Sequence, residues 1–220
     1  MTRQLRVVPV GKAVEATSAV ATYDSIRELV KDKELLAVAP CICRKQQGLL
    51  GRPCDRPPET CLAFDVVAQT WLENGLARRI TRDELMDILD LGEENGLVLS
   101  PTNSENILNV CMCCGCCCGL LRALKKYPRP ADYVQSSFHC RVDSQLCNGC
   151  GTCEDRCQMG AIKERSGLYE VDVARCIGCG LCASTCPQEA ISLVPKQDVA
   201  PLAANYVELQ FKMAADRGSM

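Results

Sequence analysis

A run of four cysteines with the spacing C-x2-C-x2-C-x3-C occurs twice near the C-terminal end of the sequence, and it constrains the fold more than any other feature. The first run begins at Cys147 and the second at Cys176, and an Ala-Ile pair follows each. Cysteines this close together are either disulfide partners or metal ligands. Gly149 and Gly178 inside the runs allow the tight turns that gather thiolates around one site.

Composition favours metal ligation over disulfides. The chain has 19 cysteines in 220 residues, and only 4% of its residues are aromatic. Disulfide scaffolds belong to secreted chains, but the sequence begins Met1-Thr2-Arg3-Gln4 without the apolar run of a signal peptide. An odd cysteine count also fits a complete disulfide set poorly. We therefore expect metal-bound thiolates in a reducing cytoplasm, with no membrane span, and a net charge of −2 gives no indication of nucleic-acid binding.

The two runs resemble those of the bacterial-type dicluster ferredoxins, over roughly residues 140–195. The resemblance implies two [4Fe-4S] clusters whose ligands cross between the runs. One cluster would bind Cys147, Cys150, Cys153 and Cys186. The other would bind Cys176, Cys179, Cys182 and Cys157. A pair of zinc sites is the alternative, but zinc typically uses two separated CxxC pairs rather than runs of four.

One position departs from the ferredoxin pattern. The second run ends Cys186-Pro187, as the family pattern has it, whereas the first ends Cys157-Gln158. Glutamine restores a backbone N–H and adds a polar side chain beside a cluster. Hydrogen bonds and solvent access tune cluster potentials, so we expect two inequivalent clusters. Apolar side chains near the runs should pack around the clusters, namely Ile162, Val171, Val173 and Ile191.

A first upstream group of cysteines can close a further metal site. It contains Cys41, Cys43, Cys54 and Cys61. Pro40 precedes the group, and Gly51, Pro53, Pro57 and Pro58 lie within it, which predicts an ordered loop rather than a helix. We favour an iron–sulfur cluster here, with a structural zinc ion or no metal as alternatives.

A second upstream group is denser still. It contains Cys111, Cys113, Cys114, Cys116, Cys117 and Cys118. Neighbouring side chains diverge in any regular conformation, so only a subset can face one cluster. Two arrangements are open: each group holds its own cluster, or both share a larger or unusual one. Cys140 belongs to no group, and its neighbour His139 is a surface or packed residue more often than a ligand.

The upstream cysteines extend the resemblance to nearly the whole chain. Pro40-Cys41-Ile42-Cys43-Arg44 and the segment 111–118, followed by a dicluster ferredoxin, look like a group of 4Fe-4S binding proteins of anaerobic bacteria. That group implies redox delivery within larger oxidoreductase systems, without naming a partner. Many of its members are longer at the N-terminus, so the chain is either a short form or a fragment.

Between the cysteine groups the sequence predicts a small scaffold. Apolar spacing predicts a helix over 62–73, and Thr81-Arg82-Asp83-Glu84 is a capping box for a second helix that Gly96 ends. We also expect strands over 5–10, 35–38 and 97–99, and helices over 25–30, 120–127 and 203–214. A winged-helix unit that binds DNA is an alternative, but the acidic second helix would repel phosphate.

Together these features predict an α+β protein in three parts. Residues 1–135 would form a cysteine-rich α/β scaffold with metal-binding loops, residues 136–197 a dicluster ferredoxin-like domain, and residues 198–220 a C-terminal helix and tail. The expected function is single-electron transfer between a donor and a redox enzyme, as a non-catalytic component with no catalytic residue. A substrate-binding upstream cluster and a redox-sensing regulator are alternatives. No dinucleotide or phosphate-binding loop is present to indicate a flavin or nicotinamide site.

Overall fold

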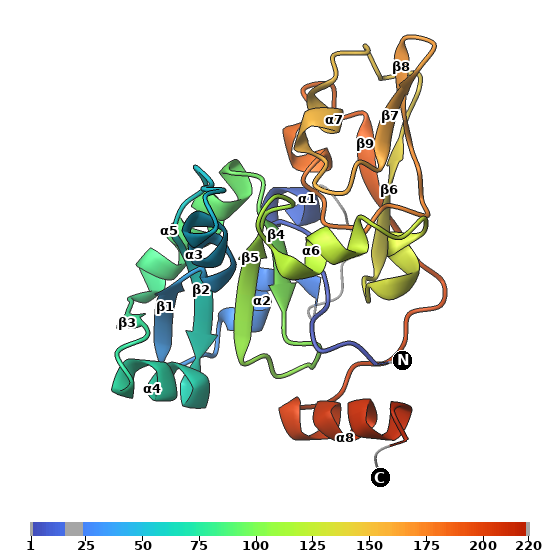
Figure 1. The fold of residues 1–220 in the computed structure, drawn as a ribbon. Helices are drawn as coiled ribbons and strands as arrows, with labels where there is room; N and C mark the ends of the chain where they lie inside the picture. The colour runs from blue at the N-terminus through green and yellow to red at the C-terminus, as the bar shows by residue number, and fades with distance from the viewer. Residues whose placement is uncertain (1, 16–23, 219–220) are drawn as a thin grey trace.

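The computed structural model describes residues 2–15 and 24–218, and it shows a mixed α/β chain (Figure 1). The upstream part is built on a five-stranded antiparallel sheet with the order β3-β1-β2-β5-β4. Its strands are β1 (Leu36–Pro40), β2 (Glu59–Phe64), β3 (Arg78–Arg79), β4 (Val98–Pro101) and β5 (Asn109–Cys113). The helices of this part are α1 (Gly11–Glu15), α2 (Ile26–Val30), α3 (Ile42–Leu49), α4 (Asp65–Glu73), α5 (Arg82–Glu94) and α6 (Gly119–Leu124).

Helix α5 follows its sequence signals closely. The hydroxyl of Thr81 accepts a hydrogen bond from the N–H of Glu84 at 3.2 Å, so Thr81 of the predicted capping box is the N-cap of the helix. Leu85 and Leu89 on one face are buried in the core. Gly96 has a φ of 68°, which ends the helix in the left-handed region.

Two expectations about secondary structure are wrong, one within the first cysteine group and one directly after it. Residues 42–49 form helix α3, not a loop, because the prolines lie outside this stretch and its Arg, Lys and Gln residues favour a helix. The helix expected over 62–73 begins only at Asp65, because Leu62 to Phe64 extend β2 between β1 and β5. Tertiary pairing overrides the helical periodicity here.

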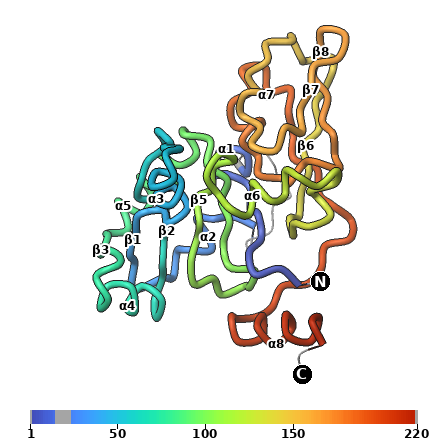
Figure 2. The backbone as a smooth tube through the Cα atoms, viewed as in Figure 1, coloured from blue at the N-terminus to red at the C-terminus, as the bar shows by residue number. Residues whose placement is uncertain are grey.

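The C-terminal part consists of short paired strands around the two cysteine runs (Figure 2). Strand β6 (Phe138–Val142) pairs with β9 (Ile191–Pro195), and β7 (Ile162–Arg165) pairs with β8 (Leu168–Val171). Helix α7 (Thr152–Arg156) and the 3-10 helices η2 (Pro130–Tyr133) and η3 (Ala183–Thr185) complete this part. The isoleucines of the two Ala-Ile pairs, Ile162 and Ile191, begin β7 and β9.

The N-terminal segment lies between the two parts and shares their core. The N–H of Val8 donates to the Leu99 carbonyl at 3.2 Å, and the N–H of Val10 donates to the Cys179 carbonyl at 3.0 Å. The strand expected over 5–10 is therefore an extended segment with isolated bridges. One continuous cluster of buried apolar side chains includes Val8, Leu99 and Leu181, so the two parts pack through a common core.

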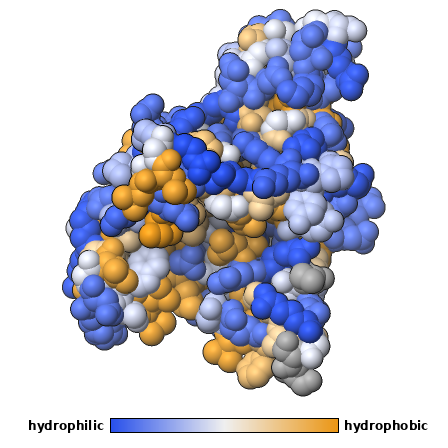
Figure 3. Space-filling view, in the orientation of Figure 1, coloured by the Kyte–Doolittle hydropathy of each residue, from blue (hydrophilic) through white to orange (hydrophobic). Residues whose placement is uncertain are grey.

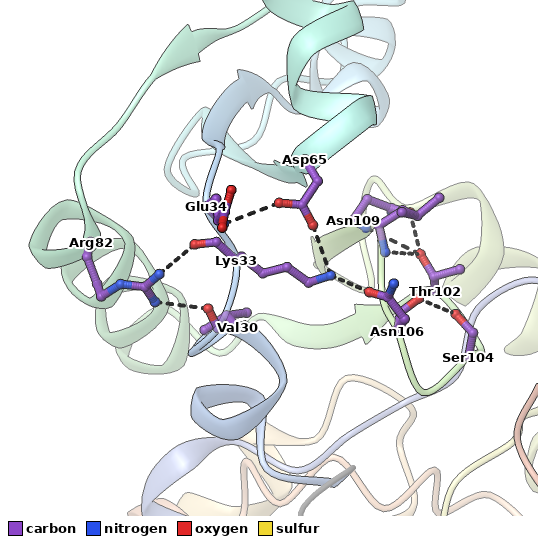
Figure 4. Close-up of polar contacts among 10 residues, drawn as sticks. Val30, Lys33, Glu34, Asp65, Arg82, Thr102, Ser104, Asn106 and Asn109 are labelled. Carbon is purple, nitrogen blue, oxygen red and sulfur yellow. Dashed lines mark hydrogen bonds and ion pairs between the residues drawn. The ribbon is translucent and has the colours of Figure 1, made fainter. Parts of the chain in front are cut away.

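A polar network fixes the turn from α2 into β1 (Figure 4). The amine of Lys33, whose side chain is 8% exposed, donates to Asp65 at 3.1 Å and to Asn106 at 2.5 Å. Asp65 also accepts from the N–H of Glu34, at 3.2 Å. Arg82 donates to the Lys33 carbonyl at 2.6 Å, which connects α5 to the same turn. The network holds α2, α4 and α5 together at the end of the sheet away from the cysteines.

The chain closes with helix α8 (Tyr206–Asp216), capped by Asn205, whose side chain accepts from the N–H of Glu208 at 3.1 Å. Ala203, Leu209 and Met213 form a small separate apolar cluster, so α8 lies beside the body rather than in its core (Figure 1). Among the described residues, no helix is long and apolar enough to cross a lipid bilayer.

Candidate metal centres

Four cysteines of the C-terminal part line a small cavity, here called the outer cavity. Cys147 and Cys150 lie on the loop after β6, Cys153 lies in α7, and Cys186 is the C-cap of η3. Cys150 is exposed, so the cavity lies close to solvent.

A second set of cysteines lines another small cavity, here called the inner cavity. Cys176, Cys179 and Cys182 come from the second run, and Cys157 comes from the first. Cys176 and Cys182 are buried, in contrast to the exposed Cys150. The two cavities thus each gather three cysteines of one run and the last cysteine of the other.

The two runs form these cavities with the same local conformation. Gly149 and Gly178 have φ angles of 72° and 68°, and a Cβ at either position would collide with a backbone carbonyl oxygen. At the end of each run, Cys157 Sγ accepts from the N–H of Ala161 at 3.2 Å, and Cys186 Sγ accepts from the N–H of Ala190 at 3.3 Å. Such donors stabilise thiolate charge and tune a bound cluster.

The expected apolar packing holds for some residues only. Ile162 lines the inner cavity and Ile191 lines the outer cavity. Val171 is half-buried against the core. The expectation for Val173 is wrong, because its side chain is 50% exposed beyond the end of β8.

Cys140 is a fifth cysteine of the inner cavity, which the sequence did not assign to a group. It lies on β6, and its Sγ is 3.4 Å from Cys182 Sγ. Its N–H donates to Cys176 Sγ at 3.4 Å. Hydrogen bonds from Cys140 lower the pKa of Cys176 to about 6, against the opposing effect of burial. Only the pairing of β6 with β9 brings Cys140 here, so no spacing signal could have identified it.

The ten other upstream cysteines separate into two groups that cut across their order in the sequence. Cys54, of the first group, lies beside three cysteines of the second group. We call these four residues the quartet: Cys54, Cys114, Cys116 and Cys117. The six others form the sextet: Cys41, Cys43, Cys61, Cys111, Cys113 and Cys118. Each group therefore draws on both segments of the chain.

The quartet lies where the α3–β2 loop meets the turn after β5. All four sulfur atoms lie within 4.8 Å of one another. Cys54 Sγ is 3.5 Å from Cys116 Sγ and 4.0 Å from Cys114 Sγ. Burial would raise the pKa of Cys114, but hydrogen bonds from Cys116 and the Cys117 N–H, with the charge of Arg44, lower it to about 7.

The sextet is assembled by the central strands. Cys61 on β2 lies directly opposite Cys111 on β5. Hydrogen bonds from Cys113 and then Cys61 lower the pKa of Cys111. Hydrogen bonds from Cys113, and from backbone N–H groups in the first turn of α6, lower the pKa of Cys118 to about 6 against the effect of burial. A thiol whose pKa is lowered by hydrogen bonds from its neighbours readily becomes a thiolate, and the thiolate is the form of cysteine that binds a metal.

Arg44 lies between the quartet and the sextet and is only 7% exposed. Its guanidinium donates to the Pro57 carbonyl at 2.8 Å, to the Met112 carbonyl at 3.0 Å and to the Thr60 hydroxyl. Burial lowers its pKa, but attraction to Cys41, Cys114 and Cys54 raises the pKa above the usual value. The fixed positive charge offsets thiolate charge on both sides.

Gln158 connects the quartet to the inner cavity. Its side-chain oxygen accepts from the N–H of Gly115, between Cys114 and Cys116, at 2.7 Å. Gln158 directly follows Cys157, so one hydrogen bond joins the two cysteine loops. The departure from the ferredoxin pattern is thus a contact between the two parts of the chain.

The C-terminal end of α5 also connects the quartet region to the first ferredoxin run. Arg156, at the end of α7, donates to the carbonyls of Glu93 at 2.6 Å and Glu94 at 2.8 Å. Arg56, near Cys54, donates to the Asn95 carbonyl. Arginines suit the unpaired carbonyls at a helix C-terminus. One helix end therefore positions both the Cys54 loop and the first ferredoxin run.

Comparison with known protein families agrees with the C-terminal geometry. Residues 146–191 match the 4Fe-4S dicluster domain, and this range contains the eight cysteines of the two runs. The C-terminal part is therefore a ferredoxin-like 4Fe-4S domain, which supports a general role in iron–sulfur electron transfer. No curated protein matches the chain.

Proposed function

We propose that the chain is an iron–sulfur electron-transfer protein or subunit, which relays single electrons between a donor and a redox enzyme in an anaerobic cytoplasm. The observation that carries this proposal is the pair of cysteine-lined cavities inside the dicluster domain. A bound [4Fe-4S] cluster supplies a one-electron couple.

The ligand sets in this proposal are the two that the cavities gather. Cys147, Cys150, Cys153 and Cys186 would hold the outer cluster, and Cys176, Cys179, Cys182 and Cys157 the inner cluster. The fit of the residues supports both: each cavity is lined by the four thiols of its set and by apolar side chains such as Ile191 or Ile162, and a backbone N–H donates to Cys186 in the outer set and to Cys157 in the inner set.

The chain gives the two sites unequal surroundings. The outer cavity has the exposed Cys150, whereas the inner cavity is enclosed by Leu181, by Cys140 and by the N-terminal segment at Val10. Burial disfavours added negative charge, while N–H donors and cations favour it. The inner and outer clusters would therefore differ in reduction potential.

The upstream cysteines would lengthen the electron path that the inner and outer clusters form. The quartet and the sextet would hold one or two further metal centres, with Arg44 providing charge compensation. Because Gly115 contacts Gln158, the order would be sextet, quartet, inner cluster and outer cluster. In this proposal residues 1–135 form the upstream metal-binding domain, residues 136–197 the dicluster domain, and residues 198–220 the C-terminal helix and tail.

Two surfaces suit exchange with redox partner proteins. The first surrounds the exposed Cys150 at the outer cavity. The second lies over α3, where Ile42, Leu49 and Leu50 are 69%, 83% and 57% exposed and the molecular surface is apolar (Figure 3). Exposed apolar clusters mark interaction sites. Ile42 lies between Cys41 and Cys43, so a partner on α3 would sit directly beside the sextet.

The test is the iron and acid-labile sulfide content of anaerobically purified protein, followed by a redox titration monitored by low-temperature EPR. The ferredoxin pair alone requires about eight irons and eight sulfides per chain, since each cluster holds four of each. Cys150→Ser should remove about four of each and one EPR signal. Zinc in place of iron in the dicluster domain, or a full iron count that no reductant changes, would refute the proposal.

A further inference from the structure

The quartet differs from the ferredoxin sites in the spacing of its sulfurs. Its four Sγ atoms all lie within 4.8 Å, and two of the pairs involving Cys54 measure 3.5 and 4.0 Å. Across residues 2–15 and 24–218, no other three His, Cys, Asp or Glu side chains bring all their ligand atoms this close. Among the described residues, no three thiols of either ferredoxin set lie within this distance of one another.

This spacing fits one ion rather than a cluster. A tetrahedral ion with metal–sulfur bonds of about 2.3 Å holds its sulfurs about 3.8 Å apart. The separations of 3.5 and 4.0 Å in the structure lie on either side of that value. A [4Fe-4S] cluster binds each thiolate to a different iron, and so it holds the sulfurs farther apart.

The protein around the quartet is built to hold a compact anionic centre. Four thiolates and a divalent ion carry a net charge of −2, which needs compensation when partly buried. The buried guanidinium of Arg44 lies beside Cys114 and Cys54. It also bonds to Pro57 in the Cys54 loop and to Met112 on β5, so it joins the two segments that supply the thiols.

The turn that carries three of the four cysteines is fixed on both sides. The N–H of Cys118 donates to the Cys114 carbonyl at 3.1 Å and closes the turn. Lys125 donates to the Gly115 carbonyl at 3.1 Å, while the Gly115 N–H donates to Gln158 at 2.7 Å. With both backbone groups of Gly115 bonded, the Cys114, Cys116 and Cys117 thiols are directed to one point beside Cys54.

We propose that Cys54, Cys114, Cys116 and Cys117 bind a single divalent iron or zinc ion in tetrahedral thiolate coordination, as a centre separate from the iron–sulfur clusters. The site stands on its own geometry. Only its connection to the inner cluster through Gly115 and Gln158 rests on the proposed function. An iron ion would extend the electron path, and a zinc ion would instead fix the junction between the two parts of the chain.

The experiment compares metal and acid-labile sulfide per chain in anaerobically purified full-length protein and three variants. Cys116→Ser and Cys54→Ser change ligands from two different segments, and Cys150→Ser is the matched control at the outer cavity. Both quartet variants should lose the same single ion, about one atom of iron or zinc, and no sulfide. The control should lose about four irons and four sulfides.

Loss of about four irons with four sulfides from either quartet variant would overturn the proposal, because that stoichiometry belongs to a cluster. An unchanged metal content in both quartet variants would also overturn it. If the two quartet variants each lose one ion as expected but the Cys150→Ser control loses no sulfide, the proposed dicluster function fails and the mononuclear site stands. Far-UV circular dichroism of each variant verifies that a loss reflects the site and not the fold, and Cys116 is exposed enough for serine to be tolerated.

Discussion

Replacing Gly115 by alanine tests whether the quartet turn and the inner ferredoxin loop are in direct contact. A Cβ at position 115 would lie 2.5 Å from Lys125 Nζ, 2.7 Å from the Gln158 carbonyl oxygen and 2.9 Å from Gln158 Oε1. The lysine amine can swing away, because it ends a flexible side chain. The Gln158 carbonyl cannot move without shifting the backbone next to Cys157.

The expected cost has two sources. Overpacking of a tight contact costs about 1–3 kcal/mol. Separating the loops also removes the bond from the Gly115 N–H to Gln158, worth about 1 kcal/mol. Together they predict a loss of about 2–4 kcal/mol, which for a chain of this size lowers Tm by roughly 4–16 °C.

The assay is the apparent Tm of the anaerobic, metal-loaded protein at a fixed scan rate. Gly48→Ala is the matched control, because Gly48 lies inside α3 and a Cβ there meets nothing within 4 Å. Alanine in a helix is more stable than glycine by roughly 0.5–1 kcal/mol, so the control should raise Tm slightly. A Gly115→Ala variant with the same Tm as the wild type would show that Gly115 and Gln158 are not in tight contact.

Three further predictions concern single side chains. Asp65→Ala should lower the free energy of unfolding, measured by urea titration, by about 2–3 kcal/mol, because alanine is strained at a φ of 53° and Lys33 loses its carboxylate partner. Asn tolerates that φ, so Asp65→Asn should lower the same free energy by only about 1 kcal/mol. Burial raises the pKa of Glu93 above its ordinary value of 4.5. Ionisation of this carboxyl group therefore favours the unfolded state, and it destabilises the protein as the pH rises above 4.5. Glu93→Gln should therefore raise Tm at pH 7 and leave it unchanged at pH 4, and equal shifts at both pH values would contradict this. Gln158→Leu removes the acceptor for Gly115 and should shift the potential of the inner cluster in an EPR-monitored titration; an equal shift in both clusters would argue against a local effect.

Local signals predicted much of the secondary structure. The Thr81 capping box and Gly96 set the limits of α5, since caps act within one helical turn. The signals failed where long-range pairing competes with periodicity. Leu62 lies at a helical spacing from the residues of α4, yet it is buried in β2 because β1 and β5 pair on both sides of it.

The sequence by itself determined the ferredoxin-like domain, because its cysteines lie in two short runs whose spacing and glycines build each loop locally. The spacing of the upstream cysteines does not by itself show which of them lie together. Their grouping depends on which strands pair and where the loops meet, and these are contacts between residues distant in the chain. Cys54 joins Cys114 only because the α3–β2 loop reaches the turn after β5. Gln158 was visible as a departure from the ferredoxin pattern, but its role as the contact with Gly115 followed from the packing of the two parts. Local spacing predicts a site when closely spaced, repeated runs supply its cysteines, whereas tertiary structure decides a site whose cysteines come from segments far apart in the chain.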